Sequence, residues 1–128
     1  MKKGKILKRI VLFCFLLTCL SWFSSNIIFA ADLFNASGKI SSIRVHALKS
    51  GYGPPQDFID VEVVIKLDSK PEESIGFQLR DNNDDTEVRR AMLDLLKDAF
   101  KNNWNVSITY WMEPGKKNGI LHRVTVVK

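Results

Sequence analysis

One segment after residue 30 has clear helical periodicity, and predicted strands lie on both sides of it. This segment is Thr86–Trp104, TEVRRAMLDLLKDAFKNNW. Asp84 precedes it as a predicted N-cap, and Glu87, three positions later, completes a capping-box pattern. The place of this one helix among strands is the main constraint on the fold.

The apolar side of the helix is wider than one packing face requires. Six residues form a stripe that we expect to face the sheet: Val88, Ala91, Met92, Leu95, Leu96 and Ala99. Three more apolar residues lie beside this stripe: Leu93, Phe100 and Trp104. They can either wrap over the end of a barrel or form a subunit interface, and the sequence leaves both alternatives open.

Five segments alternate between apolar and polar residues with the period of two that is typical of half-buried strands. They are Gly38–Leu48, Phe58–Leu67, Ser74–Arg80, Asn105–Met112 and Ile120–Val127. In the second of these, Asp60, Glu62 and Lys66 are expected to face water. A change of parity within the first predicts a bulge near Ser41 and Ser42. Gly76, on the outer side of the third, would allow another backbone to approach closely.

The order of these elements predicts an all-β fold with one helix, in the order β-β-β-α-β-β. Alternating strands favour antiparallel pairing, and closing five strands into a small barrel removes the exposed edges. This is the order of the OB-fold, a five-stranded barrel with a helix between the third and fourth strands. The alternative is an open five-stranded sheet with the helix packed across one face.

The N-terminal segment differs from the rest of the chain. Lys2, Lys3 and neighbouring basic residues precede an uncharged apolar run, Ile10–Phe23, and the segment ends at Ala30 and Ala31. This is the pattern of a secretory signal peptide, so we expect residues 1–30 to be cleaved, 31–37 to form a flexible lead-in and 38–128 to form the domain. An uncleaved anchor, or a lipoprotein cut before Cys19, is the alternative.

Charge and cysteine content narrow the function classes. Five of the 19 basic residues and none of the 14 acidic residues lie in residues 1–30, so residues 31–128 carry 14 of each. Sequence-independent nucleic-acid binding needs an excess of clustered Lys and Arg, so we do not expect it. Cys14 and Cys19 both lie in the predicted signal, which leaves the domain without a disulfide or a reactive thiol.

Neither a catalytic nor a metal-binding pattern is present. His46 and His122 lie far apart in predicted strands, with no nucleophile pattern beside them. Asp81, Asn83 and Asp85 have the spacing of the first three calcium-loop ligands, but the pattern lacks the turn glycine and the final glutamate. We therefore expect no enzyme activity, no metal and no cofactor.

Two loops are the candidate binding region, because the loops between strands 1 and 2 and between strands 4 and 5 flank the usual OB-fold ligand face. Here they are Lys49–Asp57 and Glu113–Gly119. The candidate ligand-binding residues on and beside them are Tyr52, Trp111, Lys116 and Lys117. Exposed aromatic rings can stack on a sugar or a base. The alternative is that the aromatic residues only pack the loops and the lysines only add solubility.

The segment that joins the helix to the fourth strand, MLDLLKDAFKNNWNVSITY, resembles the B-subunits of AB5-type bacterial toxins. That resemblance implies an OB-fold whose helix lines a ring of five subunits with glycan sites on the ring. The chain departs from this group because such subunits commonly hold a disulfide. It is equally similar to a family of small periplasmic OB-fold proteins of the envelope and stress response.

We therefore expect an exported, non-catalytic binding module, secreted or periplasmic, with a glycan or another small polar molecule as its ligand and self-association through the helix. After signal cleavage we expect no membrane span. The alternative is a monomeric periplasmic or cell-envelope protein that acts through protein or cell-wall contacts.

Overall fold

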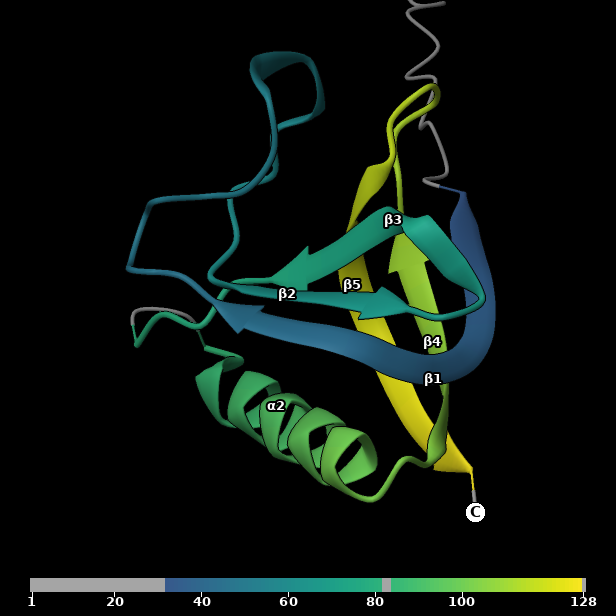
Figure 1. Ribbon diagram of the computed structural model, residues 1–128. Coiled ribbons are helices and arrows are strands. Elements are labelled where there is room, and N and C mark those ends of the chain that lie inside the picture. Colours follow the sequence, from purple (N-terminus) through teal and green to yellow (C-terminus); the bar gives the residue numbers. More distant parts are fainter. Residues whose placement is uncertain (1–31, 82–83, 128) are drawn as a thin grey trace, which may run out of the picture. The chain divides into compact units, whose positions relative to one another are not determined.

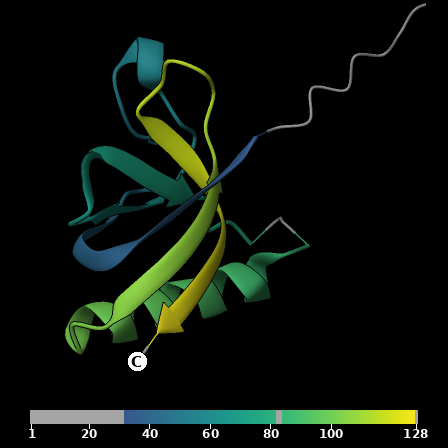
Figure 2. The ribbon, with the colours of Figure 1, turned by 90° about the vertical axis from the view of Figure 1, so that its right-hand side faces the viewer.

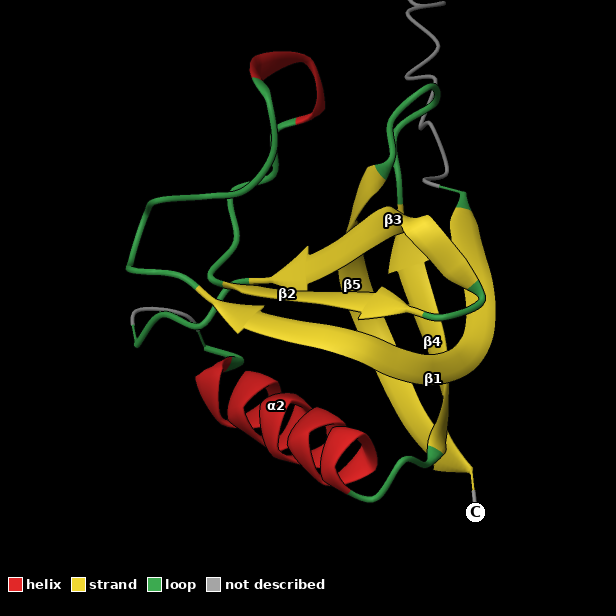
Figure 3. Ribbon diagram, in the orientation of Figure 1, coloured by secondary structure: helices red, strands yellow, loops and turns green. Residues whose placement is uncertain are grey.

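The computed structural model describes residues 32–81 and 84–127. The predicted signal peptide, residues 1–30, lies outside the described residues. The elements follow in the order β1 (Leu33–Val45), η1 (Pro55–Asp57), β2 (Val63–Leu67), β3 (Lys70–Phe77), α2 (Thr86–Lys101), β4 (Asn105–Trp111) and β5 (Asn118–Val127). The strands close into a barrel in the order β1-β2-β3-β5-β4, as Figures 1 and 3 show. The predicted five-stranded barrel with one helix between β3 and β4 is confirmed, and its topology is OB-fold-like.

Strand β1 is long and bent, and it pairs with two neighbours. Its first half, Leu33–Lys39, pairs with β4, and its second half pairs with β2. The register shifts between Ile40 and Ser42, which confirms the predicted bulge. The strand begins at Leu33 rather than at Gly38, because pairing of residues 33–37 with β4 is part of what closes the barrel.

The closing pair of strands is parallel, whereas the other pairs are antiparallel. Ser74, Ile75 and Gly76 of β3 run beside Asn118, Gly119 and Ile120 of β5. This pairing places the start of β5 next to the second half of β3. It also makes the sheet mixed, whereas the alternating pattern favoured antiparallel pairing throughout.

The second and third strands also differ from prediction in their boundaries. The second strand begins at Val63 rather than at Phe58, because residues 58–62 belong to a loop that folds back on the barrel. The third spans Lys70–Phe77 rather than Ser74–Arg80. The turn before it is only Asp68 and Ser69, since Leu67 already pairs with Lys70.

The helix α2 packs against β1, β4 and β5 across one end of the barrel (Figure 2). Leu96 and Ala99 are fully buried, and Met92, Leu93 and Trp104 pack against the same core. Thr86 begins the helix, with Asp85 rather than Asp84 at the N-cap and no side-chain cap hydrogen bond. Among the described residues, no helix is long and apolar enough to cross a membrane.

The predicted helix faces are half correct. Met92, Leu96 and Ala99 pack inward as expected, but the other half of the predicted stripe is exposed: Val88 (61%), Ala91 and Leu95 (37%). Of the predicted interface residues, Leu93 and Trp104 pack against the core and only Phe100 is exposed, at 49%. The helix is rotated about its own axis relative to the predicted orientation. Apolar residues lie on both flanks of Leu96, so either flank was suitable for burial.

A second apolar cluster lies on the outside of the barrel. Val64 and Ile120 point outward, because their neighbours in the strands belong to the interior core. Tyr52, Ile59 and Val61, from residues 46–62, cover them. The loop between β1 and β2 therefore folds over the outer face of β2, β3 and β5.

Both clusters draw their members from residues 36–126. Residues 31–128 therefore contain a complete core and form a unit that can fold on its own.

Gly76 is the position that lets the loop approach the sheet. A Cβ atom there would lie 2.6 Å from Val61 Cγ2 and 2.7 Å from the Val63 carbonyl oxygen. The close approach predicted at this glycine is confirmed.

We expect Gly76→Ala to lower the free energy of unfolding by about 1–3 kcal/mol, because an added methyl group in a closely packed site forces a shift of its neighbours. Urea denaturation of residues 31–128 measures this change. Adding Val61→Ala should restore only part of the loss, since the Val63 carbonyl belongs to the backbone and still crowds the site. An unchanged urea midpoint for Gly76→Ala would contradict the packing described for this loop.

Candidate functional site

The two loops that flank the usual OB-fold ligand face are joined by a set of hydrogen bonds that we call the Asp57 clasp. The backbone N–H groups of Lys117 and Asn118 both donate to Asp57 Oδ1, each at 3.1 Å. Asn118 Nδ2 donates to the Asp57 carbonyl at 2.7 Å. The clasp fixes η1 against the β4–β5 hairpin, so the two loops form one rigid wall.

A cavity of about 180 Å³ lies beside the clasp, and we call it the aromatic groove. It is lined by Phe58, Ile59, Asp60, Trp111, Glu113, Lys116, Asn118 and Ile120. Trp111 points outward because Tyr110, next to it, is buried in the interior core. Phe58 is 45% exposed. The groove therefore combines two accessible aromatic rings with carboxylate, amide and ammonium groups.

The polar groups of the groove are held in place. Lys116 Nζ lies 2.6 Å from Glu113 Oε2. Asp60 accepts hydrogen bonds from Arg80 and Gln78. The Arg80 hydrogen bond is the main reason that the pKa of Asp60 lies below its ordinary value, so this carboxylate is ionised at neutral pH.

The structure brings together two of the four residues predicted as ligand-binding. Trp111 and Lys116 line the groove, whereas Tyr52 does not. The Tyr52 ring packs in the second apolar cluster, and Arg44 Cζ lies 5.8 Å from the centroid of that ring. The Tyr52 hydroxyl accepts a hydrogen bond from Ser74 Oγ at 3.3 Å.

Lys117, the fourth residue, is exposed, and its Nζ lies 4.0 Å from Glu72 Oε2. Its backbone, rather than its side chain, serves the region through the Asp57 clasp. Phe58 and Asn118 also line the groove, and the sequence pattern did not single them out as candidates. Phe58 shares the parity of Asp60, which was expected to face water, and this pattern could have indicated an exposed aromatic residue.

The outer face of β2 and β3, where OB-folds usually bind their ligands, is covered in this protein. Val61 is fully buried there, and Ile59 is nearly so. The covering segment is part of an apolar core, so the surface that is open to a ligand is displaced to the edges of residues 46–62.

A buried carboxylate holds this covering loop to the segment that follows β3. Glu62 is only 2% exposed, although its place in an alternating pattern predicted a residue facing water. Its Oε1 accepts hydrogen bonds from the Lys49 backbone N–H at 3.0 Å and from Arg80 Nε at 2.7 Å. Its Oε2 accepts from the Leu79 N–H at 3.0 Å. The side chain is buried because the fold supplies these donors.

Burial raises the pKa of Glu62, but the hydrogen bonds from Arg80, Leu79 and Lys49 outweigh this effect, and the pKa lies below its ordinary value of 4.5. Glu62 is therefore ionised at neutral pH and forms a buried ion pair with Arg80. Such a pair is costly to break, because the remaining charge is left without its partner.

The described residues hold no group of three His, Cys, Asp or Glu side chains that could bind a metal ion. His46 follows β1, where its ring centroid lies 5.7 Å from that of Tyr52, whereas His122 is exposed in β5. Comparisons of the chain with protein-family models, with curated proteins and with solved structures found no match.

The position of Glu62 predicts how stability depends on pH. The pKa of Glu62 is lower in the folded protein than its ordinary value of 4.5. Its stabilising contribution is therefore complete above pH 4.5 and is lost as the pH falls through the pKa of the folded state. We expect Glu62→Gln to reduce the free energy of unfolding by about 3 kcal/mol at neutral pH. The difference from the unchanged protein should shrink as the pH falls below 4.5.

Urea titrations at a series of pH values measure this difference. Glu72→Gln is the matched control, because Glu72 is exposed and makes only a distant ion pair, so its effect should be small at every pH. A gap between Glu62→Gln and the unchanged protein that stays constant from neutral to acidic pH would contradict the assignment.

Proposed function

We propose that this chain is an exported recognition module that binds a glycan in the aromatic groove. The observation that carries the proposal is the meeting of Trp111 and Phe58 with Asp60, Glu113, Lys116 and Asn118 around one cavity of about 180 Å³. A sugar ring presents an apolar face and a rim of hydroxyl groups. Aromatic rings suit the first, and carboxylate and amide groups suit the second.

The shape of the region supports the same proposal. The groove lies between two loops that the Asp57 clasp holds together, so little ordering is needed when a ligand binds. Export rests on the signal-peptide pattern of residues 1–30, and the likeness to toxin B-subunits in the helix-to-β4 segment adds to the glycan hypothesis.

We expect Trp111→Ala to weaken glycan binding by at least about tenfold, or about 1.4 kcal/mol, because the apolar face of the sugar loses the aromatic ring on which it stacks. A glycan array with labelled residues 31–128, followed by calorimetry on the strongest ligand, measures this effect. Phe58→Ala should act in the same direction. Tyr52→Phe is the control: it removes the hydroxyl that is hydrogen-bonded to Ser74 and leaves the groove intact, so it should bind normally. An array without any signal would exclude the glycan proposal.

The helix supports self-association as a second part of the proposal. Val88, Ala91 and Leu95 are exposed and share one side of α2 by their spacing. Phe100, the exposed member of the predicted interface, lies roughly 140° around the helix from Leu95, at about 100° per residue. The proposed contact between subunits is therefore the Val88–Ala91–Leu95 flank, and it replaces Leu93 and Trp104, which pack against the core.

Light scattering of residues 31–128 after size exclusion tests this contact. We expect a mass of several subunits for the unchanged protein and a monomer for Leu95→Glu, because a charge on this flank would have to be buried between subunits. Lys97→Glu, on the same helix but on its exposed polar side, should keep the larger mass. A monomeric mass for the unchanged protein would favour the alternative of a monomeric envelope protein.

A further inference from the structure

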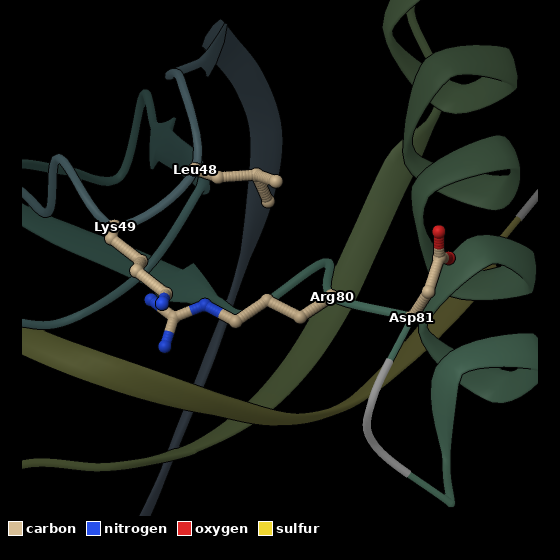
Figure 4. Close-up of a pocket in the computed structure, with 4 residues that line it drawn as sticks. All are labelled: Leu48, Lys49, Arg80 and Asp81. Atoms are coloured by element: carbon tan, nitrogen blue, oxygen red, sulfur yellow. The ribbon is translucent and has the colours of Figure 1, made fainter.

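A second cavity shares no lining residue with the aromatic groove. It lies beside Leu48 and Lys49, near the start of the covering loop. It has a volume of about 330 Å³ and is lined by Leu48, Lys49, Arg80 and Asp81 (Figure 4). A water molecule occupies roughly 30 Å³ in the liquid, so the cavity has room for a small ligand group and several waters. Figure 4 shows Lys49 and Arg80 directed toward the same region, with Asp81 at the other side beside the helix.

The two cationic residues are held beside each other by one buried atom. Glu62 Oε1 accepts hydrogen bonds both from the Lys49 backbone N–H and from Arg80 Nε. Arg80 is further fixed by Asp60, which accepts from its Nη1 at 3.0 Å and from its Nη2 at 2.5 Å. The backbone of Lys49 and the guanidinium of Arg80 are therefore fixed by the fold.

The backbone of Lys49 has an uncommon conformation. Its φ is +62°, in the left-handed region that residues other than Gly, Asn and Asp seldom adopt. Such a conformation costs free energy and persists only where the surrounding structure maintains it. Here the hydrogen bond from the Lys49 N–H to buried Glu62 maintains it, and the result is a lysine at the wall of a cavity.

The charges around the cavity are paired with one exception. Arg80 is bound by Asp60 and Glu62, and Asp81 forms an ion pair with Arg90. Within residues 32–81 and 84–127, the Lys49 ammonium has neither a salt bridge nor a hydrogen bond, although it lies near enough to Asp60 to act on it electrostatically. Arg80 Nη1 carries two N–H bonds and donates one hydrogen bond, so a second donor remains available.

We propose that this cavity is an oxyanion-binding site, in which the Lys49 ammonium and the remaining Arg80 Nη1 N–H bind a phosphate, sulfate or carboxylate group. The site is distinct from the aromatic groove in its residues and in its ligand chemistry, so it stands or falls independently of glycan binding. Charge-assisted hydrogen bonds from Lys and Arg are the usual means by which proteins hold such groups. The exposed Leu48 side chain forms an apolar wall for the part of a ligand that carries the anion.

The test is a titration of ¹⁵N-labelled residues 31–128 with inorganic phosphate, sulfate and acetate in turn, at constant ionic strength maintained with sodium chloride. We expect saturable shifts of the Lys49 amide and the Arg80 Nε–H signal, with at least one of the three anions. Binding of phosphate and sulfate alone would assign the site to tetrahedral oxyanions, and binding of acetate would extend it to carboxylates.

Lys49→Asn removes the ammonium and keeps a residue that tolerates positive φ, so it should weaken the binding by at least about tenfold. Lys49→Gly is a second variant for the same backbone and should behave alike. Lys49→Arg should retain binding, and so should Lys101→Asn, which removes an exposed lysine in the last turn of α2. The proposal is overturned if none of the anions gives a saturable shift, if the shifts spread evenly over surface lysines, or if Lys49→Asn and Lys49→Gly bind as well as the unchanged protein.

Discussion

The hydrogen bonds of the buried Glu62 carboxylate are the interaction on which the arrangement of the covering loop, and of the two cavities beside it, depends. The carboxylate joins Lys49, in the loop between β1 and β2, to Leu79 and Arg80, in the segment that follows β3. A buried carboxylate must be hydrogen-bonded and paired, and these donors come from parts of the chain that only the fold brings together. Within the same loop, Asp57 of η1 makes a second connection, to the first residue of β5.

These two anchors explain why the barrel does not present the usual OB-fold ligand face. The loop is held by the hydrogen bonds of Glu62 and Asp57. It places Val61 against Gly76 and buries the outer side of β2 and β3. Open surface remains at the edges of the loop, at the aromatic groove and at the cavity that Lys49 and Arg80 line. Asp60 connects the two regions, since it lines the groove and is hydrogen-bonded to Arg80, which lines the cavity.

The helix and the candidate site show which structural features a local sequence pattern does not predict. Both flanks of Leu96 carry apolar residues, so the period of 3.6 located the helix but not its rotation, and Val88 and Leu95 proved to be exposed. The outward direction of Trp111 was predicted correctly, because an alternating strand fixes which side chains point outward. Tyr52 lies in a loop, where no such period applies, and its ring is used to pack the loop.

The sequence by itself determined the number and order of the strands, the position of the helix, the bulge near Ser41 and Ser42 and the need for a small residue at Gly76. Each of these follows from hydrophobic period or from local backbone geometry, which a short segment carries within itself. Only the tertiary structure decided the parallel pairing of β3 with β5, the rotation of α2, the burial of Glu62 and the meeting of Phe58 with Trp111. These features depend on donors and surfaces that lie far apart in the chain, and a local pattern does not contain them.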